Sequence, residues 1–158
     1  MALRAAPRRP FTLKAAAVRL LARREYARAE LGERLIARGA DRAEVERVLD
    51  ELERGGFLSD ARFAQALVAQ KAGRYGKRAI AHELREKRVA SAAAQEALTV
   101  LAHTDELAEA IALWERRFGA APKDPREKAR QMRFLLARGY DVSIALKVLR
   151  RAAGGNER

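Results

Sequence analysis

The sequence has no cysteine and only two histidines among its 158 residues. The absence of cysteine excludes disulfides, thiolate metal sites and cysteine nucleophiles. It is also typical of proteins in a reducing compartment, so we expect a cytoplasmic location. His82 and His103 are too few for a histidine-based zinc site. We therefore expect no metal centre.

Residues typical of strands and of membrane spans are also scarce. Val, Ile and Thr together number 15, and polar and apolar residues do not alternate strictly, which argues against a β-rich fold. No apolar run approaches the ~18 residues of a spanning helix, so we expect no membrane segment. Alanine supplies 35 residues, and because its side chain buries little surface, the hydrophobic fraction of 49% overstates the core.

Catalytic motifs are missing as well. Ser59 and Ser91 stand where helix caps belong, and neither has a histidine and an acid at a recognisable spacing. The Gly55-Gly56 pair lacks the Lys-Ser or Lys-Thr that completes a phosphate-binding loop. The sequence therefore predicts that the protein is not an enzyme and that it has no catalytic residues and no cofactor.

Positive charge is what the sequence has in excess. Lys and Arg number 33 against 21 Asp and Glu, which gives a net charge of +12. Residues 1–72 contribute +5, residues 73–118 contribute +1 and residues 119–158 contribute +6. Such charge attracts polyanions, which include nucleic acid, anionic membrane and acidic protein. The alternative is a solvated surface in an arginine-preferring genome, since Arg outnumbers Lys 26 to 7.

The first 24 residues carry seven bases and no acid, a composition that also describes an organellar transit peptide. Serines are missing there, however, and the first helix continues into the repeat pattern described below. We therefore expect residues 1–11 to be a disordered basic arm. At the other end, residues 153–158 are expected to be a flexible tail.

Helix caps and stops divide the chain into nine expected helices. Thr12, Asp41 and Asp124 are N-cap candidates, and Gly39 and Gly139 are stop signals. The expected helices begin near residues 12, 28, 41, 59, 76, 91, 104, 124 and 142. Most of them carry an apolar stripe at helical spacing. The sequence therefore predicts an all-α protein.

An internal repeat groups these helices in threes. The sequence of residues 35–41 returns at 135–141 as Leu-Leu-Ala-Arg-Gly-Tyr-Asp, and an offset of 49 relates Leu35 to Leu84. A period near 50 residues is typical of solenoid-like arrays. We predict three tandem three-helix repeats at 12–54, 55–102 and 103–152, each with a longer helix followed by two shorter ones, in an elongated, curved array. Such a surface suits binding along a filament or nucleic acid better than closing around a small substrate.

The fifth expected helix carries a row of bases. Arg78, Arg85 and Arg88 fall at i, i+7 and i+10 within one sector of ~80°, and Arg74 and Lys77 stand at the helix entrance. The row lies to the side of the apolar stripe, so it points into a groove or out to solvent. Rows of this kind match a phosphate backbone or an acidic protein face. The alternative is an exposed face with unpaired bases.

The eighth expected helix repeats the arrangement. Arg126, Arg130 and Arg133 fall at i, i+4 and i+7, with Lys128 close by. Phe134 lies beside these bases and away from the apolar stripe, so it either bridges to the next helix or is exposed for a partner. Two rows at equivalent positions of two repeats favour a binding function.

The remaining aromatic residues fall into two groups. Phe63, Trp114 and Phe118 lie on apolar stripes and are predicted core residues. Tyr75 and Tyr140 stand at helix boundaries beside bases, where helix-end packing is favoured and stacking on a partner is the alternative.

Three segments of the chain carry a family likeness. Residues 57–63 (Phe-Leu-Ser-Asp-Ala-Arg-Phe) match Leu-x-Asp-x-x-Phe, residues 76–84 match Gly-x-x-x-Ile-x-x-Glu-Leu, and residues 133–140 match Arg-Phe-Leu-x-x-Arg-Gly-Phe apart from Tyr140. In this order and at these separations they resemble the RecX family over residues 15–151. The chain departs from the family pattern at Ala27, where serine is common, and at Arg88, where glycine is usual.

The resemblance implies three tandem three-helix repeats that lie in the groove of the RecA filament on single-stranded DNA. There the protein would impede filament growth and suppress ATP hydrolysis and strand exchange, and so modulate recombination and DNA repair. The residues alone leave open a stand-alone DNA- or RNA-binding helical module. No exposed coiled-coil seam argues for a dimer, so we expect a monomer. The candidate filament or DNA contacts are Arg74, Lys77, Arg78, Arg85, Arg88, Arg126, Lys128, Arg130, Arg133 and Phe134.

Overall fold

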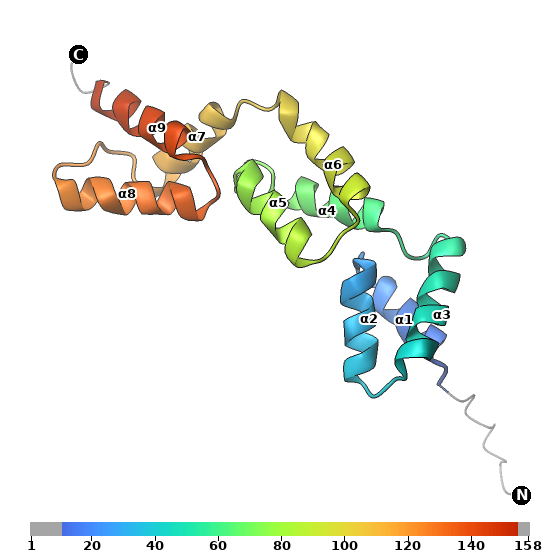
Figure 1. Ribbon diagram of the computed structural model, residues 1–158. Helices are drawn as coiled ribbons and strands as arrows, with labels where there is room; N and C mark the ends of the chain where they lie inside the picture. Colours follow the sequence, from blue (N-terminus) through green and yellow to red (C-terminus); the bar gives the residue numbers. More distant parts are fainter. Residues whose placement is uncertain (1–10, 155–158) are drawn as a thin grey trace, which may run out of the picture. The chain divides into compact units, whose positions relative to one another are not determined.

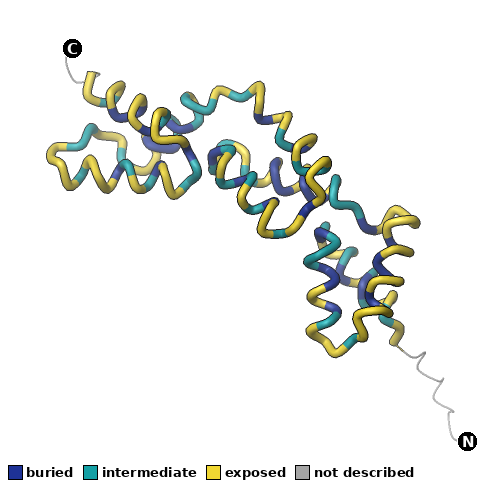
Figure 2. The backbone as a smooth tube through the Cα atoms, viewed as in Figure 1, coloured by how far each residue is buried: buried dark blue, intermediate teal, exposed yellow. Residues whose placement is uncertain are grey.

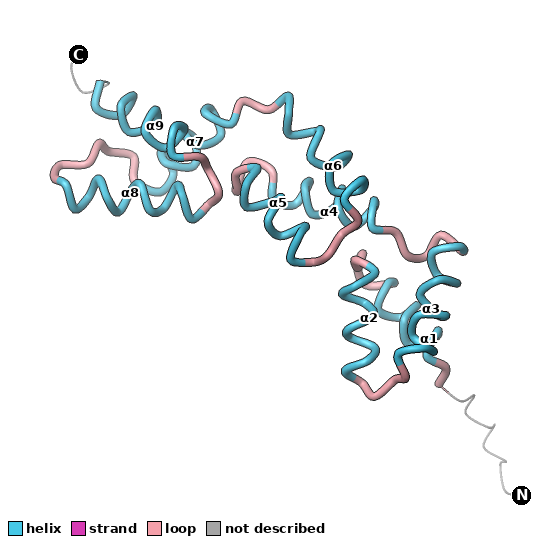
Figure 3. Tube along the Cα trace, in the orientation of Figure 1, coloured by secondary structure: helices cyan, strands magenta, loops and turns pink. Residues whose placement is uncertain are grey.

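The computed structural model describes residues 11–154, and these residues form nine α-helices, one short 3₁₀ helix and no strand (Figures 1 and 3). The all-α prediction and the helix count are therefore confirmed. The predicted basic arm at residues 1–10 and the tail at residues 155–158 lie outside the described residues. The helices are α1 (Leu13–Leu21), α2 (Arg28–Ala37), α3 (Arg42–Arg54), α4 (Asp60–Lys71), α5 (Lys77–Glu86), α6 (Ser91–Thr99), η1 (Val100–His103), α7 (Glu106–Arg117), α8 (Pro125–Ala137) and α9 (Val142–Gly154).

The helices divide between two compact units, the first ending at Asp60 and the second beginning at Ala61. The first unit holds α1, α2 and α3, which form the first repeat. The second unit holds the second repeat (α4, α5 and α6) and the third repeat (α7, α8 and α9), with α4 starting at the last residue of the first unit. In both units the helices turn a buried face inward and leave the opposite face exposed (Figure 2).

Helix lengths follow the predicted order of one longer helix and two shorter ones only in the second repeat, where α4, α5 and α6 have 12, 10 and 9 residues. In the first repeat α1 has 9 residues and α3 has 13, and in the third repeat α7 has 12 residues while α8 and α9 have 13 each. The first helix ends at Leu21, and the chain that follows it places Tyr26 in the core, where Tyr26 is 3% exposed. At the other end, α9 includes residues 153 and 154, which we had assigned to the tail.

Side-chain caps begin several helices where the sequence indicated. The Thr12 hydroxyl accepts from the Ala15 N–H at 3.1 Å, and Asp41 accepts from the Glu44 N–H at 3.2 Å. Asp105 caps α7, and Asp124 caps α8 by accepting from the Glu127 N–H at 2.8 Å. Each cap satisfies a backbone donor that has no partner inside its helix.

The second helices of the first two repeats are capped differently. Their N-cap residues, Ala27 and Gly76, offer no side-chain acceptor. The Asp60 carboxylate instead accepts from the Arg28 N–H at 2.8 Å, and the Glu106 carboxylate accepts from the Lys77 N–H at 2.9 Å. Asp60 and Glu106 are the first residues of α4 and α7, so each cap comes from the beginning of the following repeat. The missing serine at position 27 is thereby compensated.

The first repeat has a core of aliphatic side chains from all three helices. Leu31 and Leu35 of α2 meet Val45 and Leu52 of α3, and all four are fully buried. Ala17 of α1 closes the same cluster. Because the buried positions recur at helical spacing, the amphipathic pattern alone specifies which faces meet.

The third repeat is built around Trp114, which α7 places against α8. The Trp114 Nε1–H donates to the Gln131 Oε1 at 2.7 Å, and the Gln131 amide nitrogen donates to the Ala120 carbonyl at 3.2 Å. Trp114 is buried, as is Phe63 in α4, which confirms both as core residues, whereas Phe118 is only half-buried. The buried indole N–H therefore has a partner, as such groups require.

The second and third repeats touch through their backbones, where the start of α5 meets the end of α8. The Gly76 N–H donates to the Arg138 carbonyl at 2.7 Å. A methyl group added at Gly76 would overlap the Gly139 carbonyl, and one added at Gly139 would overlap Ala79. Gly139 also has φ +87°, a conformation that disfavours other residues. This contact is therefore possible only because glycine stands on both sides.

Candidate polyanion-binding interface

Three arginines follow one face of α8. Arg126, Arg130 and Arg133 are exposed and lie within a sector of about 60° at 100° per residue. Asp124 and Pro125 fix where this helix starts, and the buried Leu135 on its other side fixes which face is solvated. We call these three arginines the α8 row.

Two arginines of α5 line a groove against the end of α8 and the start of α9. Arg78 and Arg85 are exposed at its edge, and His82 lies between them on the same helix face. The groove has a volume of about 620 Å³. We call it the junction groove, and its lining residues are Arg78, Ala79, Ala81, His82, Arg85, Leu136, Ala137, Gly139 and Val142.

The α8 row leads toward this groove. Ala137, which lines the groove, comes four residues after Arg133 and therefore lies on the same face of α8. The fixed contact between Gly76 and Arg138 holds the start of α5 against the end of α8. Within the second unit, Arg133 of the α8 row thus lies one helical turn from the groove that Arg78 and Arg85 line.

No carboxylate among residues 61–154 lies within 4 Å of the guanidinium groups of the α8 row or of Arg78 and Arg85. Arg130 has an aromatic neighbour, with its guanidinium 5.7 Å from the Phe118 ring centre. Glu86 contacts His82 at 3.9 Å, and both side chains are exposed. Uncompensated guanidinium groups in a row form a site for phosphates or carboxylates.

The entrance of α5 is less cationic than the sequence suggested. Lys77 is half-buried and lies close to Glu109 of α7. Burial and the charge of Glu106 raise the pKa of Glu109, and the Lys77 ammonium partly opposes this rise. Arg74 is exposed, and its guanidinium donates to the Gln70 carbonyl at 2.7 Å. The charge of Lys77 is therefore balanced in part by the third repeat.

Arg88 does not continue the α5 row, so that part of the predicted geometry is wrong. The helix ends at Glu86, and Arg88 adopts φ +52° beyond it. Gly39 and Gly139, at the matching positions of the other repeats, have φ +92° and +87°. Arg88 thus occupies a helix-ending turn that normally takes glycine, a conformation that costs a non-glycine residue about 1 kcal/mol.

Lys128 lies away from the α8 row, whereas Phe134, one helical turn after Arg130, borders it. Lys128 is on another face of α8, beside Leu146 and Arg150 of α9. The Phe134 ring packs edge-on against Phe118, with 5.3 Å between ring centres, and is half-buried. Of the two roles considered for Phe134, the structure places its ring in packing between elements of the third repeat.

Sequence reasoning missed Arg138 as the residue that joins the second and third repeats. Its guanidinium donates to the Arg74 carbonyl at 3.1 Å and lies 5.0 Å from the Tyr75 ring centre and 5.3 Å from the Phe134 ring centre. Tyr75 is therefore occupied by helix-end packing. The repeat-like segment Arg138-Gly139 was the available signal, but only the fold shows what it contacts.

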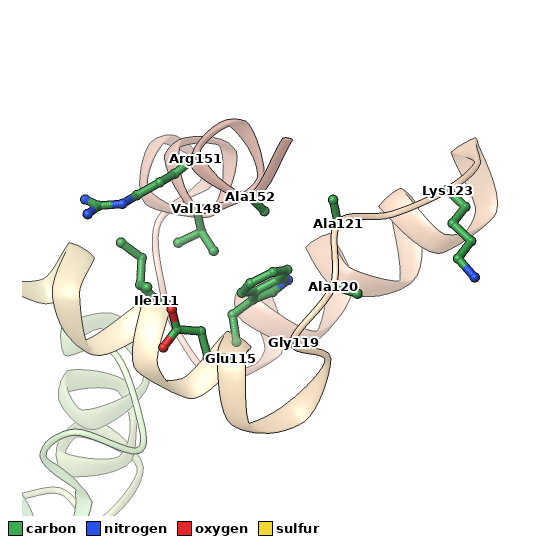
Figure 4. Close-up of a pocket in the computed structure, with 10 residues that line it drawn as sticks. Ile111, Glu115, Gly119, Ala120, Ala121, Lys123, Val148, Arg151 and Ala152 are labelled. Atoms are coloured by element: carbon green, nitrogen blue, oxygen red, sulfur yellow. The ribbon is translucent and has the colours of Figure 1, made fainter. Parts of the chain in front are cut away.

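A second cavity also escaped the sequence reasoning. It has a volume of about 540 Å³ and lies between α7, α9 and residues 119–123 (Figure 4). Ile111, Val148 and Ala152 give it apolar walls, and Arg151 and Lys123 lie far apart along it. None of the ten predicted site residues lines this cavity.

Residues 11–154 contain no group of three or more His, Asp or Glu side chains arranged to hold a metal ion. No helix in this range is both long and apolar enough to cross a lipid bilayer.

Comparison with known proteins places these features in a family. The models of the first, second and third three-helix domains of RecX match residues 14–52, 59–98 and 104–152. The regulatory protein RecX of Leptothrix cholodnii is 44% identical over 148 residues, which cover 94% of each chain. The regulatory protein RecX of Ralstonia pickettii is 39% identical over 151 residues, 96% of this chain and 92% of that one.

A solved structure shares the fold. The crystal structure of RecX from Lactobacillus salivarius superposes with a TM-score of 0.70 at 17% identity, and the match covers 89% of this chain and 94% of that chain. Three domain matches in chain order, together with relatives this similar over nearly their whole length, show that the chain belongs to the RecX family.

Proposed function

We propose that this chain binds the RecA–single-stranded DNA filament through the α8 row and the junction groove. By occupying the filament it limits filament extension, ATP hydrolysis and strand exchange, and so modulates recombination and DNA repair in the cytoplasm. It acts as a monomer and carries out no chemistry itself. Membership of a family whose relatives are named regulatory proteins supports a regulatory role of this kind.

The observation that carries the proposal is the uncompensated row of arginines on α8. Each exposed guanidinium of Arg126, Arg130 and Arg133 lacks a carboxylate within ion-pair distance among residues 61–154. A filament of recombinase on DNA presents phosphates and acidic side chains along its length, and cations spaced one helical turn apart bind several of them at once. Lys77, Arg74 and Arg88 contribute less because they lie outside this row.

The ATPase activity of RecA filaments tests the proposal directly. Adding the protein is expected to lower ATP turnover, and the Arg126→Ala/Arg130→Ala/Arg133→Ala variant is expected to need at least a tenfold higher concentration for the same effect. The matched control is Arg42→Ala/Arg47→Ala/Arg54→Ala, which removes three exposed arginines from the equally long α3. No inhibition by the parent protein rejects the function, and equal losses in both variants reject the site.

A stand-alone DNA- or RNA-binding module is the competing function. Titration with single-stranded oligonucleotide at several salt concentrations separates the two. Contacts to about five phosphates predict that log affinity falls with log salt at a slope of roughly −4. Tight binding of free oligonucleotide with this slope, and no stronger binding to the filament, favours the stand-alone module.

A further inference from the structure

The junction groove differs from the α8 row in having an apolar floor. Leu136 and Val142 stand in it with 37% and 47% of their surface exposed, which is high for large aliphatic side chains. Ala79, Ala81 and Ala137 complete this floor, and Arg78 and Arg85 stand at its edge. The groove therefore offers apolar and cationic contacts together.

Such a floor does not suit nucleic acid. Single-stranded DNA binds without sequence preference by stacking its bases on aromatic rings. No Phe, Tyr or Trp ring lines the junction groove, and its one aromatic ring, the His82 imidazole, lies 3.9 Å from the Glu86 carboxylate. The neighbouring rings are engaged elsewhere. Tyr140 is fully buried, the Tyr75 ring lies between Lys71 and Arg138, and the Phe134 ring packs on Phe118.

The cations along the groove have a spacing that fits a helix. Arg78 and Arg85 are seven residues apart on α5, which separates them by roughly 10 Å along the helix axis. Two acidic residues seven positions apart on a second helix have the same separation, and the face of that helix between them can carry aliphatic side chains. Amphipathic helices bind apolar grooves between other helices in this way.

The acids near the groove leave its positive charge in excess. Asp141 precedes Val142, and its carboxylate accepts from the Ser143 N–H at 2.8 Å. Hydrogen bonds from Ser143, together with the charge of Arg78, lower the pKa of Asp141. Glu86 lies 3.9 Å from the His82 ring nitrogen, and both side chains are exposed. Two guanidinium groups therefore still face the groove without a close carboxylate.

We propose that the junction groove binds an acidic amphipathic helix of a protein partner, with aliphatic side chains on Leu136 and Val142 and carboxylates on Arg78 and Arg85. This inference rests on the proposed function, because the helix is expected on the protein component of the filament. The chain then divides its contacts between two places. The α8 row binds phosphates, and the junction groove binds protein.

The test removes the apolar floor and leaves every charge in place. Leu136→Gln/Val142→Thr changes two partly exposed side chains, so thermal unfolding is expected to stay near that of the parent. The matched control is Leu146→Gln/Val100→Thr, which makes the same replacements at exposed positions outside the groove. Each variant is measured for inhibition of filament ATPase, for co-sedimentation with the filament and for affinity to labelled oligo(dT).

The proposal expects the groove variant to lose at least tenfold in filament inhibition and co-sedimentation while its oligo(dT) affinity stays within twofold. An equal loss of oligo(dT) affinity shows that the groove holds nucleic acid, which overturns the proposal. Unchanged inhibition, or an equal loss in the control variant, overturns it as well. If the parent protein neither inhibits nor co-sediments with the filament, the proposed function fails, a result distinct from failure of the groove alone.

Discussion

The first and third repeats have the same three-helix plan and similar segments at residues 35–41 and 135–141, where five of seven residues are identical, but they differ in how their charged side chains are paired. In the first repeat Arg28 binds Glu46, Asp50 and Glu53 at 2.8–3.0 Å. Burial opposes the charge of Arg28, but the hydrogen bonds to these acids outweigh it and raise the pKa of the guanidinium. In the third repeat, residues 104–154 contain no ion pair.

Matching positions of α2 and α8 carry opposite signs. Glu30 and Glu33 stand where α8 has Arg130 and Arg133. Glu30 is itself paired with Arg24 at 2.7 Å. Exposed arginines without acidic neighbours remain available to a polyanion, whereas paired ones do not. In the first repeat Arg24 and Arg28 are paired, while Arg42, Arg47 and Arg54 of α3 are exposed and have no carboxylate within ion-pair distance among residues 11–154. The two repeats therefore differ at these matched positions, where α2 carries acids and α8 carries the exposed arginines for which we propose polyanion binding.

The largest effect, on the free energy of unfolding, is expected when the glycine at the N-cap of α5 is replaced by the alanine that stands at the N-cap of α2. Ala27 of α2 corresponds to Gly76 of α5, and Gly76→Ala places a methyl group against the Gly139 backbone. Overpacking of this kind costs about 2 kcal/mol, because neither backbone can move without losing the Gly76–Arg138 hydrogen bond. Urea unfolding measures the loss.

Gly154→Ala serves as the control, since nothing lies within 4 Å of the added methyl group. It is expected to change the free energy of unfolding by less than about 0.5 kcal/mol. If Gly76→Ala is equally neutral, the close contact between the second and third repeats does not exist in solution.

The second largest effect is expected from a charge reversal on α8. Arg130→Glu/Arg133→Glu gives α8 the acids found at the matching positions of α2. Oligo(dT) affinity is expected to fall more than tenfold, and the slope of log affinity against log salt to flatten by about 1.4, at about 0.7 per lost phosphate contact. Fluorescence anisotropy over a salt series checks both.

Arg42→Glu/Arg47→Glu on α3 controls for net charge, because both arginines are exposed in the first repeat. It is expected to lower the affinity less than threefold. Equal effects of the two reversals would mean that overall charge, and not the α8 row, governs binding.

The caps that cross between repeats predict a smaller effect. Asp60→Ala removes the acceptor of the Arg28 N–H and should cost about 1 kcal/mol in urea unfolding. Adding Ala27→Ser should restore most of it, because a serine at the N-cap supplies a local acceptor. In the second repeat Glu106→Ala should cost the same, but Gly76→Ser cannot restore it, because its Cβ overlaps Gly139.

If Ala27→Ser and Gly76→Ser restore stability equally well, the close contact at Gly76 that this prediction assumes is contradicted. A loss well below 1 kcal/mol for both Asp60→Ala and Glu106→Ala would show that water caps these helices adequately.

The smallest effect is expected at Tyr140, which occupies the position of Ala40 in the first repeat. Tyr140 is fully buried, and its hydroxyl has no hydrogen-bond partner among residues 11–154. Tyr140→Phe removes that polar group and should raise the free energy of unfolding by up to about 1 kcal/mol at pH 7.

The same substitution has a signature in alkaline solution. Burial, together with the charges of Glu109 and Glu106, raises the pKa of Tyr140 to about 12 from its ordinary value of 10.0. Because the pKa of Tyr140 is higher in the folded state than in the unfolded state, the neutral hydroxyl's contribution to the free energy of unfolding is fully present below pH 10. This contribution is lost as the pH rises toward 12. The advantage of Tyr140→Phe should therefore grow over this range. A constant difference between pH 9 and 12 would place the hydroxyl in contact with water.

The helix caps, the repeat and the α8 row could be predicted from the sequence, because they depend on residues close together in the chain. The caps at Thr12, Asp41 and Asp124 need only a side-chain oxygen three residues before a free N–H. The repeat and the α8 row need only helical periodicity. The motif segments Gly76–Leu84 and Arg133–Tyr140, which carried the family likeness, turned out to meet each other at the contact between the second and third repeats.

Two properties depended on residues far apart in the chain: Lys77 is partly balanced by Glu109, and Arg138 links the second and third repeats. The helix end at Arg88 is local, and the repeat that aligns this position with Gly39 and Gly139 was the signal for it. Helical spacing predicts which face of a helix a residue occupies, but not what stands opposite that face. The sequence by itself therefore determined nine helices, their grouping and the placement of cations on them. Only packing decided which cations meet a carboxylate and which stay exposed, because ion pairing depends on distances of a few ångströms that periodicity does not set.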